Sequence, residues 1–263
     1  VKSLFHEPWE GNPAPRVHLA QGGMINAVGL QGPGVVAWIH ESLPVLEAAN
    51  VTTVASIWGR TVHEYVLAAN QLRAAGQTIS AIEVNLSCPN LEGRSGIIAH
   101  DPSLAGQIIS AVCSESSVPV WAKLSANTDR VVEVATTVRD AGASALTLIN
   151  TMLGMQINTS SGRASLGNGG GGLSGPAIRP IAVRAVHDVK AAMPDVDIIG
   201  VGGIASGNDA IEMMMAGARA VQVGTASFAS PSAVWDIACE ASVLMKKLGY
   251  SSWADLVGCV HRS

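Results

Sequence analysis

Short apolar segments alternate with helical patterns along the whole chain, and this alternation limits the folds that the sequence can adopt. Seven segments are almost continuously apolar, which is typical of parallel strands covered on both faces. They are Val1–Phe5, Val51–Ile57, Ala81–Leu86, Val118–Leu124, Ala145–Ile149, Asp197–Val201 and Ala220–Val223. Because strand and helix alternate throughout, we predict an α/β fold with a parallel sheet, either doubly wound or closed as a barrel.

The segments between these strands carry recognisable helix boundaries. Thr61–Glu64 forms a capping box, and Asp101–Pro102 supplies an N-cap followed by proline in the first turn. An apolar stripe at helical spacing follows Pro176, and Ser206–Asp209 precedes an apolar run that stops at Gly217. We therefore expect four helices to begin at these positions.

The number of strands favours a barrel. A (β/α)8 TIM barrel that lacks its first strand would leave seven strands, and the chain starts at Val1 inside a strand-like segment, so we expect an N-terminally truncated barrel. A dinucleotide-binding sheet fits less well, because no G-x-G-x-x-G follows an early strand. No linker or change of composition interrupts residues 1–263, which predicts a single domain. We expect Asn158–Gly172, which has few apolar residues, to be an excursion on a barrel face.

Composition narrows the classes of partner. The net charge is −4 and the basic residues are scattered singly, which argues against nucleic acid and anionic membrane as partners. Charged residues make up only 14% of the chain, which favours coverage of part of the surface by another subunit. The four cysteines form neither a disulfide framework nor a metal pattern, the seven histidines show no metal spacing, and no apolar stretch reaches membrane-spanning length. We predict a cytoplasmic protein without a metal site.

One cysteine lies in a polar setting at the end of a predicted strand. The sequence Asn-Leu-Ser-Cys-Pro-Asn occupies residues 85–90, and the carboxyl ends of barrel strands form the active-site face. A thiol there can act as a base or a nucleophile, and the two flanking carboxamides can donate and accept hydrogen bonds. Because Pro89 imposes an extended bend, we interpret Cys88 as functional, and the other three cysteines as small apolar residues.

The last two predicted strands end in small residues, at Gly202-Gly203 and at Gly224-Thr225. In barrels the loops after strands seven and eight commonly bind a phosphate through backbone N–H groups, and a helix that starts at Ser206–Asp209 would add a favourable dipole. Tight packing of strand against helix also requires glycine. Two glycine-ended strands in succession favour the phosphate site.

A lysine and several carboxamides are expected at the same mouth. Lys123 closes an apolar strand, where a cation is expensive to bury without a partner, although a lysine that extends its ammonium group to water at a strand end would account for it too. Carboxamides suit a planar ligand with N–H and C=O edges, such as a pyrimidine, and lysine suits a carboxylate. The residues expected to converge are Lys2, Asn26, Asn85, Asn90, Lys123 and Asn150.

These residues belong to a series of motifs that resembles the flavin-dependent dihydroorotate dehydrogenases over nearly the whole chain. The order of the motifs makes the resemblance specific. They occupy residues 12–16, 26–31, 85–90, 123–127, 150–151, 171–180, 199–204 and 221–225.

The resemblance implies a TIM barrel that binds FMN and oxidises dihydroorotate to orotate in pyrimidine biosynthesis. A cysteine at position 88, where other members carry serine, resembles the cytosolic class 1 enzymes. The forms of the motifs at residues 123–127, 150–152 and 171–176 resemble the NAD-linked subclass. In that subclass a homodimer of FMN subunits pairs with subunits that carry FAD and an iron–sulfur cluster and pass the electrons to NAD.

The resemblance also implies roles for individual residues. Cys88 would be the base that removes the proton at C5 while the hydride leaves C6 for the flavin. The implied substrate contacts are Lys2, Asn26, Val28, Gly29, Leu30, Asn85, Asn90, Asn150 and Thr151. The implied flavin contacts are Lys2, Lys123, Ser174, Gly175, Gly202, Gly203, Gly224 and Thr225.

Three alternatives stay open at the level of sequence. A flavin domain of the dihydropyrimidine dehydrogenase type also uses a loop cysteine, but it typically has histidine where Asn90 stands, and Lys2 favours a substrate with a carboxylate. A flavin-free barrel acting on a sugar phosphate would share the glycine loops. A non-catalytic scaffold that only binds a partner would need neither the loop cysteine nor the glycine loops. The electron acceptor, NAD or fumarate, would be set by groups outside this chain.

Overall fold

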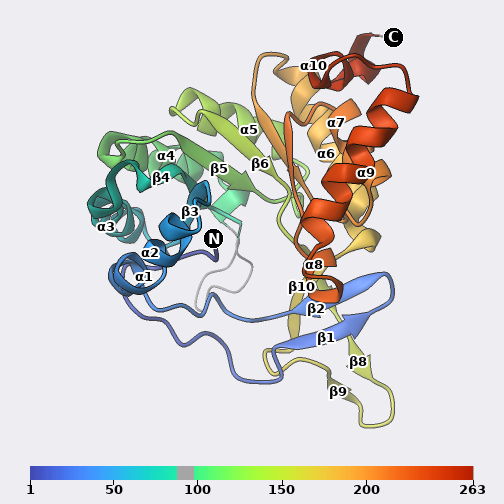
Figure 1. Ribbon diagram of the computed structural model, residues 1–263. Coiled ribbons are helices and arrows are strands. Elements are labelled where there is room, and N and C mark those ends of the chain that lie inside the picture. The colour runs from blue at the N-terminus through green and yellow to red at the C-terminus, as the bar shows by residue number, and fades with distance from the viewer. Residues whose placement is uncertain (88–97, 263) are drawn as a thin grey trace.

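A curled parallel sheet forms the centre of the molecule (Figure 1). The computed structural model describes residues 1–87 and 98–262. The parallel strands stand in the order β12-β11-β6-β5-β4-β3. Their bounds are Thr53–Ile57 (β3), Ile79–Asn85 (β4), Val120–Leu124 (β5), Ala145–Leu148 (β6), Ile198–Val201 (β11) and Ala220–Gln222 (β12). These strands confirm six of the seven predicted segments and the predicted α/β barrel architecture.

The seventh predicted strand, Val1–Phe5, contributes a single bridge to the sheet. Leu4 pairs in parallel with Ile57. Its N–H donates to the carbonyl of Ser56 across 2.8 Å, and its carbonyl accepts from the N–H of Trp58 across 3.0 Å. The carbonyl of Phe5 instead accepts from Val35. The Val1 amino group donates to the carbonyl of Val54 across 2.8 Å, but the chain turns away after Leu4. The segment therefore forms one bridge, and the prediction of a full strand here was wrong.

Helices cover the outer face of the sheet, and successive helices pack side by side from α3 to α7 and from α7 to α9. The α-helices are Val35–Glu41 (α1), Leu43–Ala48 (α2), Val62–Leu72 (α3), Pro102–Glu115 (α4), Val131–Asp140 (α5), Arg179–Ala192 (α6), Gly207–Met215 (α7), Ala226–Ala229 (α8), Ala233–Lys247 (α9) and Trp253–Leu256 (α10). Short 3₁₀ turns lie at Arg73–Thr78, Ile98–His100, Pro176–Ile178 and Cys259–Arg262. The largest buried cluster lies between these helices and the sheet.

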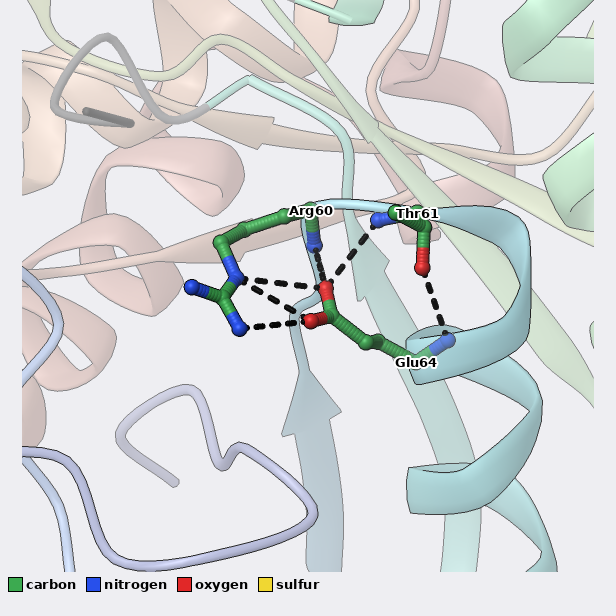
Figure 2. Close-up of polar contacts among 3 residues, drawn as sticks. All are labelled: Arg60, Thr61 and Glu64. Carbon is green, nitrogen blue, oxygen red and sulfur yellow. Dashed lines mark hydrogen bonds and ion pairs between the residues drawn. The ribbon is translucent and has the colours of Figure 1, made fainter. Parts of the chain in front are cut away.

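Three of the four predicted helix starts are confirmed, and at the fourth a 3₁₀ turn from Pro176 precedes α6. Helix α3 shows why such starts could be predicted (Figure 2). The Thr61 hydroxyl accepts from the N–H of Glu64 across 3.2 Å, and the Glu64 carboxylate accepts from the N–H of Thr61 across 3.1 Å. The guanidinium of Arg60 adds an ion pair of 2.7 Å to the same carboxylate. Asp101 and Ser206 cap α4 and α7 in the same local manner. Each of these starts depends on neighbours within four residues.

A second, antiparallel sheet lies where the chain leaves the carboxyl end of β6 (Figure 1). Its order is β1-β2-β10-β7, and a small hairpin of β8 and β9 extends from it. The bounds are Val17–Ala20 (β1), Gly23–Asn26 (β2), Met152–Met155 (β7), Ile157–Asn158 (β8), Arg163–Ala164 (β9) and Gly170–Ser174 (β10). This sheet brings residues from both halves of the chain to one end of the parallel strands.

The expectation that Asn158–Gly172 forms only an excursion was wrong at its C-terminal end, where β10 begins. Gly172 pairs with Asn26 on one side and with Leu153 on the other. A Cβ at Gly171 would lie 2.4 Å from the carbonyl oxygen of Asn26, and one at Gly172 would lie 2.1 Å from the hydroxyl of Thr151. The glycine run is therefore a strand that needs close approach of its neighbours, which periodicity cannot reveal because glycine has no side chain.

Candidate functional site

A cavity of about 760 Å³, called here the larger cavity, lies at the carboxyl ends of the parallel strands. Side chains of Ile149, Ile178 and Val201 contribute to its apolar walls. Predicted site residues contribute much of its remaining lining. They are Lys2, Asn26, Val28, Lys123, Asn150, Thr151, Ser174, Gly175, Gly202, Gly203, Gly224 and Thr225.

A smaller cavity of about 260 Å³ adjoins it. The two cavities share Lys2, Asn26, Val28, Lys123, Asn150, Thr151 and Gln222. The smaller cavity adds the predicted residues Gly29, Leu30 and Asn85, together with Glu83 and Ser56. Every predicted site residue within the described ranges therefore lines one or both cavities. Cys88 and Asn90 lie outside the described residues.

The register of the parallel sheet explains why these side chains meet. Asn85 on β4 stands beside Lys123 on β5, and Lys123 stands beside Thr147 on β6. Asn85 is only 5% exposed. Because side chains alternate across a strand, residues at the last inward position of neighbouring strands form one layer at the mouth of a barrel.

Asn85 and Asn150 fix the backbone that leads to Cys88. The Asn85 side-chain oxygen accepts from the N–H of Ser87 across 3.2 Å, and its amide nitrogen donates to the Ser3 hydroxyl across 3.2 Å. The Asn150 amide nitrogen donates to the carbonyl of Ser87 across 2.6 Å. These contacts hold Ser87 from Asn85 on β4 and from Asn150, which lies two residues beyond β6.

Two further asparagines hold the antiparallel sheet against the cavity. Asn26 donates from its amide nitrogen to the carbonyl of Gly172 across 3.3 Å. Asn127, which the sequence analysis did not assign to the site, donates to the carbonyl of Thr151 across 3.0 Å and accepts from the N–H of Leu153 across 2.8 Å. Its signal was present in the motif at residues 123–127. Asn127 supports Thr151 from behind instead of lining the cavity.

Other residues that line the larger cavity carry backbone N–H groups that are suited to bind an anion. In residues 1–87 and 98–262, the N–H groups of Gly203, Gly224 and Thr225 donate to no acceptor. The Thr225 hydroxyl donates to the Ser174 hydroxyl across 2.8 Å, which joins two loops that line this end. A Cβ built on Gly224 would meet nothing within 4 Å, so open space borders this residue. Convergent backbone donors of this kind bind phosphate.

Several N–H groups at the start of α7 donate to side chains of the protein itself. The N–H of Gly207 donates to Glu240 across 2.7 Å, the N–H of Ala205 donates to Asp209 across 3.0 Å, and the N–H of Asp209 donates to Ser206. The N–H groups of Gly207 and Asp209 in the first turn therefore have partners within the chain. The favourable dipole expected from this helix start stays a prediction.

The sequence analysis also missed a buried carboxylate beneath the mouth. Glu83 is 6% exposed, and one of its oxygens accepts from Thr147 across 2.8 Å and from Gln222 across 3.0 Å. The only signal in the sequence was a single glutamate within an apolar strand. The bond to Gln222 runs from β4 to β12 across the concave side of the sheet and shows how strongly the sheet curls.

Two kinds of feature are absent from the described part of the chain. Its His, Cys, Asp and Glu residues form no group of three or more that could hold a metal ion. Among its helices, none combines the length and the apolar composition needed to cross a bilayer.

Comparisons with known proteins agree with the geometry. The family described as dihydroorotate dehydrogenase matches residues 1–245. The chain is 44% identical over 260 residues to the dihydroorotate dehydrogenase B (NAD(+)) catalytic subunit of Pelobacter propionicus, covering 99% of this chain and 85% of that protein. Proteins of the same name from Bacillus pumilus and Geobacillus kaustophilus are each 42% identical over 258 residues, covering 98% of this chain and 83% and 82% of those proteins.

Proposed function

The chain belongs to the dihydroorotate dehydrogenase family, and from this premise we propose how its two cavities perform the reaction. The protein is a flavin-dependent oxidoreductase that converts dihydroorotate to orotate in pyrimidine biosynthesis. The relatives are named as dihydroorotate dehydrogenases, which favours this reaction over the two alternative enzymes considered from the sequence, a dihydropyrimidine dehydrogenase and a flavin-free isomerase. The convergence of carboxamides, two lysines and unpartnered backbone donors on one pair of cavities supports the assignment of roles below.

FMN fits the larger cavity. The N–H groups of Gly203, Gly224 and Thr225 suit its phosphate, and the open space beside Gly224 leaves room for it. Lys123 lines both cavities and suits the electron-rich edge of the ring, while Ile149 and Val201 suit its apolar face. When bound, FMN supplies the acceptor for the hydride.

Dihydroorotate fits the smaller cavity. Asn26, Asn85 and Asn150 line it and carry the alternating donors and acceptors that match a pyrimidine ring. Lys2 lines it too and matches the carboxylate of the substrate. Asn90 is assigned to the same set by its motif. The loop of Val28, Gly29 and Leu30 closes one side of this cavity.

Cys88 is proposed as the base that takes the proton from C5. The residue before it, Ser87, is held through its N–H by Asn85 and through its carbonyl by Asn150. The Ser87 hydroxyl donates to the carbonyl of Lys123 across 2.6 Å. Three bonds thus hold the residue that precedes Cys88 in the sequence, and a general base needs support that keeps it within reach of its proton.

The relatives are named catalytic subunits of an NAD(+)-linked enzyme, so they work with a further subunit. We propose that this chain forms a homodimer and passes electrons to NAD through a partner subunit that carries FAD and an iron–sulfur cluster. The cysteines in the described ranges are free, which suits the reducing environment of the cytoplasm.

The cofactor assignment is tested by denaturing the purified protein and identifying the flavin that it releases. We expect FMN at one molecule per chain. Release of FAD would overturn the choice of flavin, and absence of any flavin would overturn the assignment of the larger cavity.

A further inference from the structure

Glu83 is a buried ionisable residue for which the proposed reaction has no use. It lies on β4 two residues before Asn85, and its side chain is almost fully removed from solvent. A carboxylate is expensive to bury without partners, so its presence in an otherwise apolar strand requires a compensating interaction.

Part of that compensation comes from the chain itself. The Thr147 hydroxyl and the Gln222 amide both donate to the same oxygen of Glu83, across 2.8 Å and 3.0 Å. Thr147 is fully buried, so bulk water does not reach its hydroxyl. Gln222, in contrast, lines both cavities. Two neutral donors satisfy hydrogen-bonding capacity but bring no positive charge, and the amino group of Val1, which lines the same cavity, interacts electrostatically with Glu83.

The cations that could balance the charge lie at the same cavity. Lys2, Glu83 and Lys123 all line the smaller cavity, and Glu83 is the single carboxylate among its described lining residues. Two further carboxylates, Asp236 and Glu240, line only the larger cavity. They accept from the Ser232 hydroxyl and from the N–H of Gly207, respectively. Among the described residues, Glu83 is therefore the carboxylate that lines the smaller cavity together with both lysines.

We infer that Glu83 is a positioning residue that offsets the lysine charge at the mouth and thereby lowers the reduction potential of the bound flavin. The inference rests on the proposed FMN site. Reduction adds negative charge to a flavin, and nearby lysines favour that charge. A fixed carboxylate in the low-dielectric interior opposes it. The carboxylate thus keeps the flavin able to pass its electrons onward.

The test compares Glu83→Gln with Thr147→Val in the flavin-loaded protein. Glu83→Gln removes the charge and keeps the shape, while Thr147→Val removes one hydrogen bond to Glu83 and keeps its charge. The readout is the midpoint potential, measured by anaerobic reductive titration against a reference dye. We expect Glu83→Gln to favour the reduced flavin by about tenfold or more, which corresponds to a rise of about 30 mV for a two-electron couple. Thr147→Val should leave the potential near that of the wild type.

A second pair of variants covers a failure of Glu83→Gln to fold. Gln222→Lys places a positive charge beside Glu83 and should raise the potential, whereas Gln222→Met removes the hydrogen bond without a charge and should not. Equal potentials in flavin-loaded wild type and the charge-changing variants would refute the role of Glu83. Equal rises in Thr147→Val or Gln222→Met would show a structural effect and refute it too. Absence of flavin from the wild type would instead refute the proposed function.

Discussion

The carboxamide of Asn150, at the end of β6, donates to the backbone carbonyl of Ser87 across 2.6 Å. This bond joins the strand that leads into the antiparallel sheet to the residue that immediately precedes Cys88. One N–H of the Asn150 amide donates to Ser87, so the second N–H and the side-chain oxygen are the groups that this residue can offer to a ligand. One side chain thus lines the proposed substrate cavity and also holds Ser87.

Replacing Asn150 with alanine should weaken orotate binding by about 1–3 kcal/mol, because polar groups are left unpaired. Asn70→Ala, at an exposed position on α3, is the matched control and should bind orotate like the wild type. Equilibrium titration of flavin absorbance with orotate measures both. If Asn150→Ala binds orotate normally, Asn150 does not contact the pyrimidine.

Replacing Cys88 with alanine should slow flavin reduction by dihydroorotate by roughly 10²–10⁴, a usual range for loss of a positioned general base. Wild-type reduction should accelerate from neutral to mildly alkaline pH, because an ordinary thiol with a pKa of about 8.5 loses its proton over that range. Cys239→Ala removes an exposed cysteine on α9 and should leave the rate unchanged. Stopped-flow bleaching of the flavin under anaerobic conditions gives the rates. A wild-type rate in Cys88→Ala would mean that the thiol only packs.

Replacing Gly224 with valine should reduce flavin content several-fold without unfolding the protein. A Cβ at this position meets no atom within 4 Å, so the side chain fits the empty protein but takes space from the proposed phosphate site. Gly32→Val is the control, because its nearest neighbours to a Cβ lie at 3.9 Å or more and Gly32 lines neither cavity. Flavin per chain and the thermal midpoint should be measured together. Full flavin content in Gly224→Val would contradict the proposed phosphate site beside Gly224.

The capping box of α3 should make stability depend on pH. Partial burial pushes the pKa of Glu64 upward, but hydrogen bonds from the Arg60 guanidinium and from backbone N–H groups outweigh it and hold the pKa below its ordinary value. A lowered folded-state pKa stabilises the protein above the unfolded pKa, and this stability is lost as the pH falls through the folded pKa.

Glu64→Gln should therefore cost about 1 kcal/mol or less at neutral pH, since the ion pair is partly exposed, and the difference from wild type should shrink below about pH 4. Urea unfolding at pH 7 and at pH 3.5 measures this difference. Glu41→Gln, at an exposed position on α1, should show no such change. A difference that stays constant with pH would assign the effect to packing.

Local signals allowed much of the fold to be predicted. The starts of α3, α4 and α7 depend on a cap and a partner three residues away, so a single sequence contains all the information. The parallel strands can be recognised in the sequence as apolar runs, because both faces of the sheet are covered. In contrast, β10 begins as a run of glycines whose role is fixed by Asn26 and Thr151, far away in sequence.

The candidate site was predictable where motifs carry it and not where it depends on pairing across the barrel. The described residues assigned to the site from the asparagine and glycine motifs line the two cavities. Glu83 was overlooked because its partners, Thr147 and Gln222, lie 64 and 139 residues away. Likewise, a capped helix start looks like an anion site in sequence, but the partner of Gly207 is Glu240, 33 residues further on.

The central claim is that dihydroorotate in the smaller cavity reduces the flavin in the larger one. The most direct measurement mixes the flavin-loaded protein with dihydroorotate under anaerobic conditions and follows flavin absorbance and orotate together. We predict complete bleaching, with one orotate formed for each flavin reduced, and no bleaching with dihydrouracil, which lacks the carboxylate assigned to Lys2. A flavin that stays oxidised with dihydroorotate, or that is reduced equally well by dihydrouracil, would contradict the account.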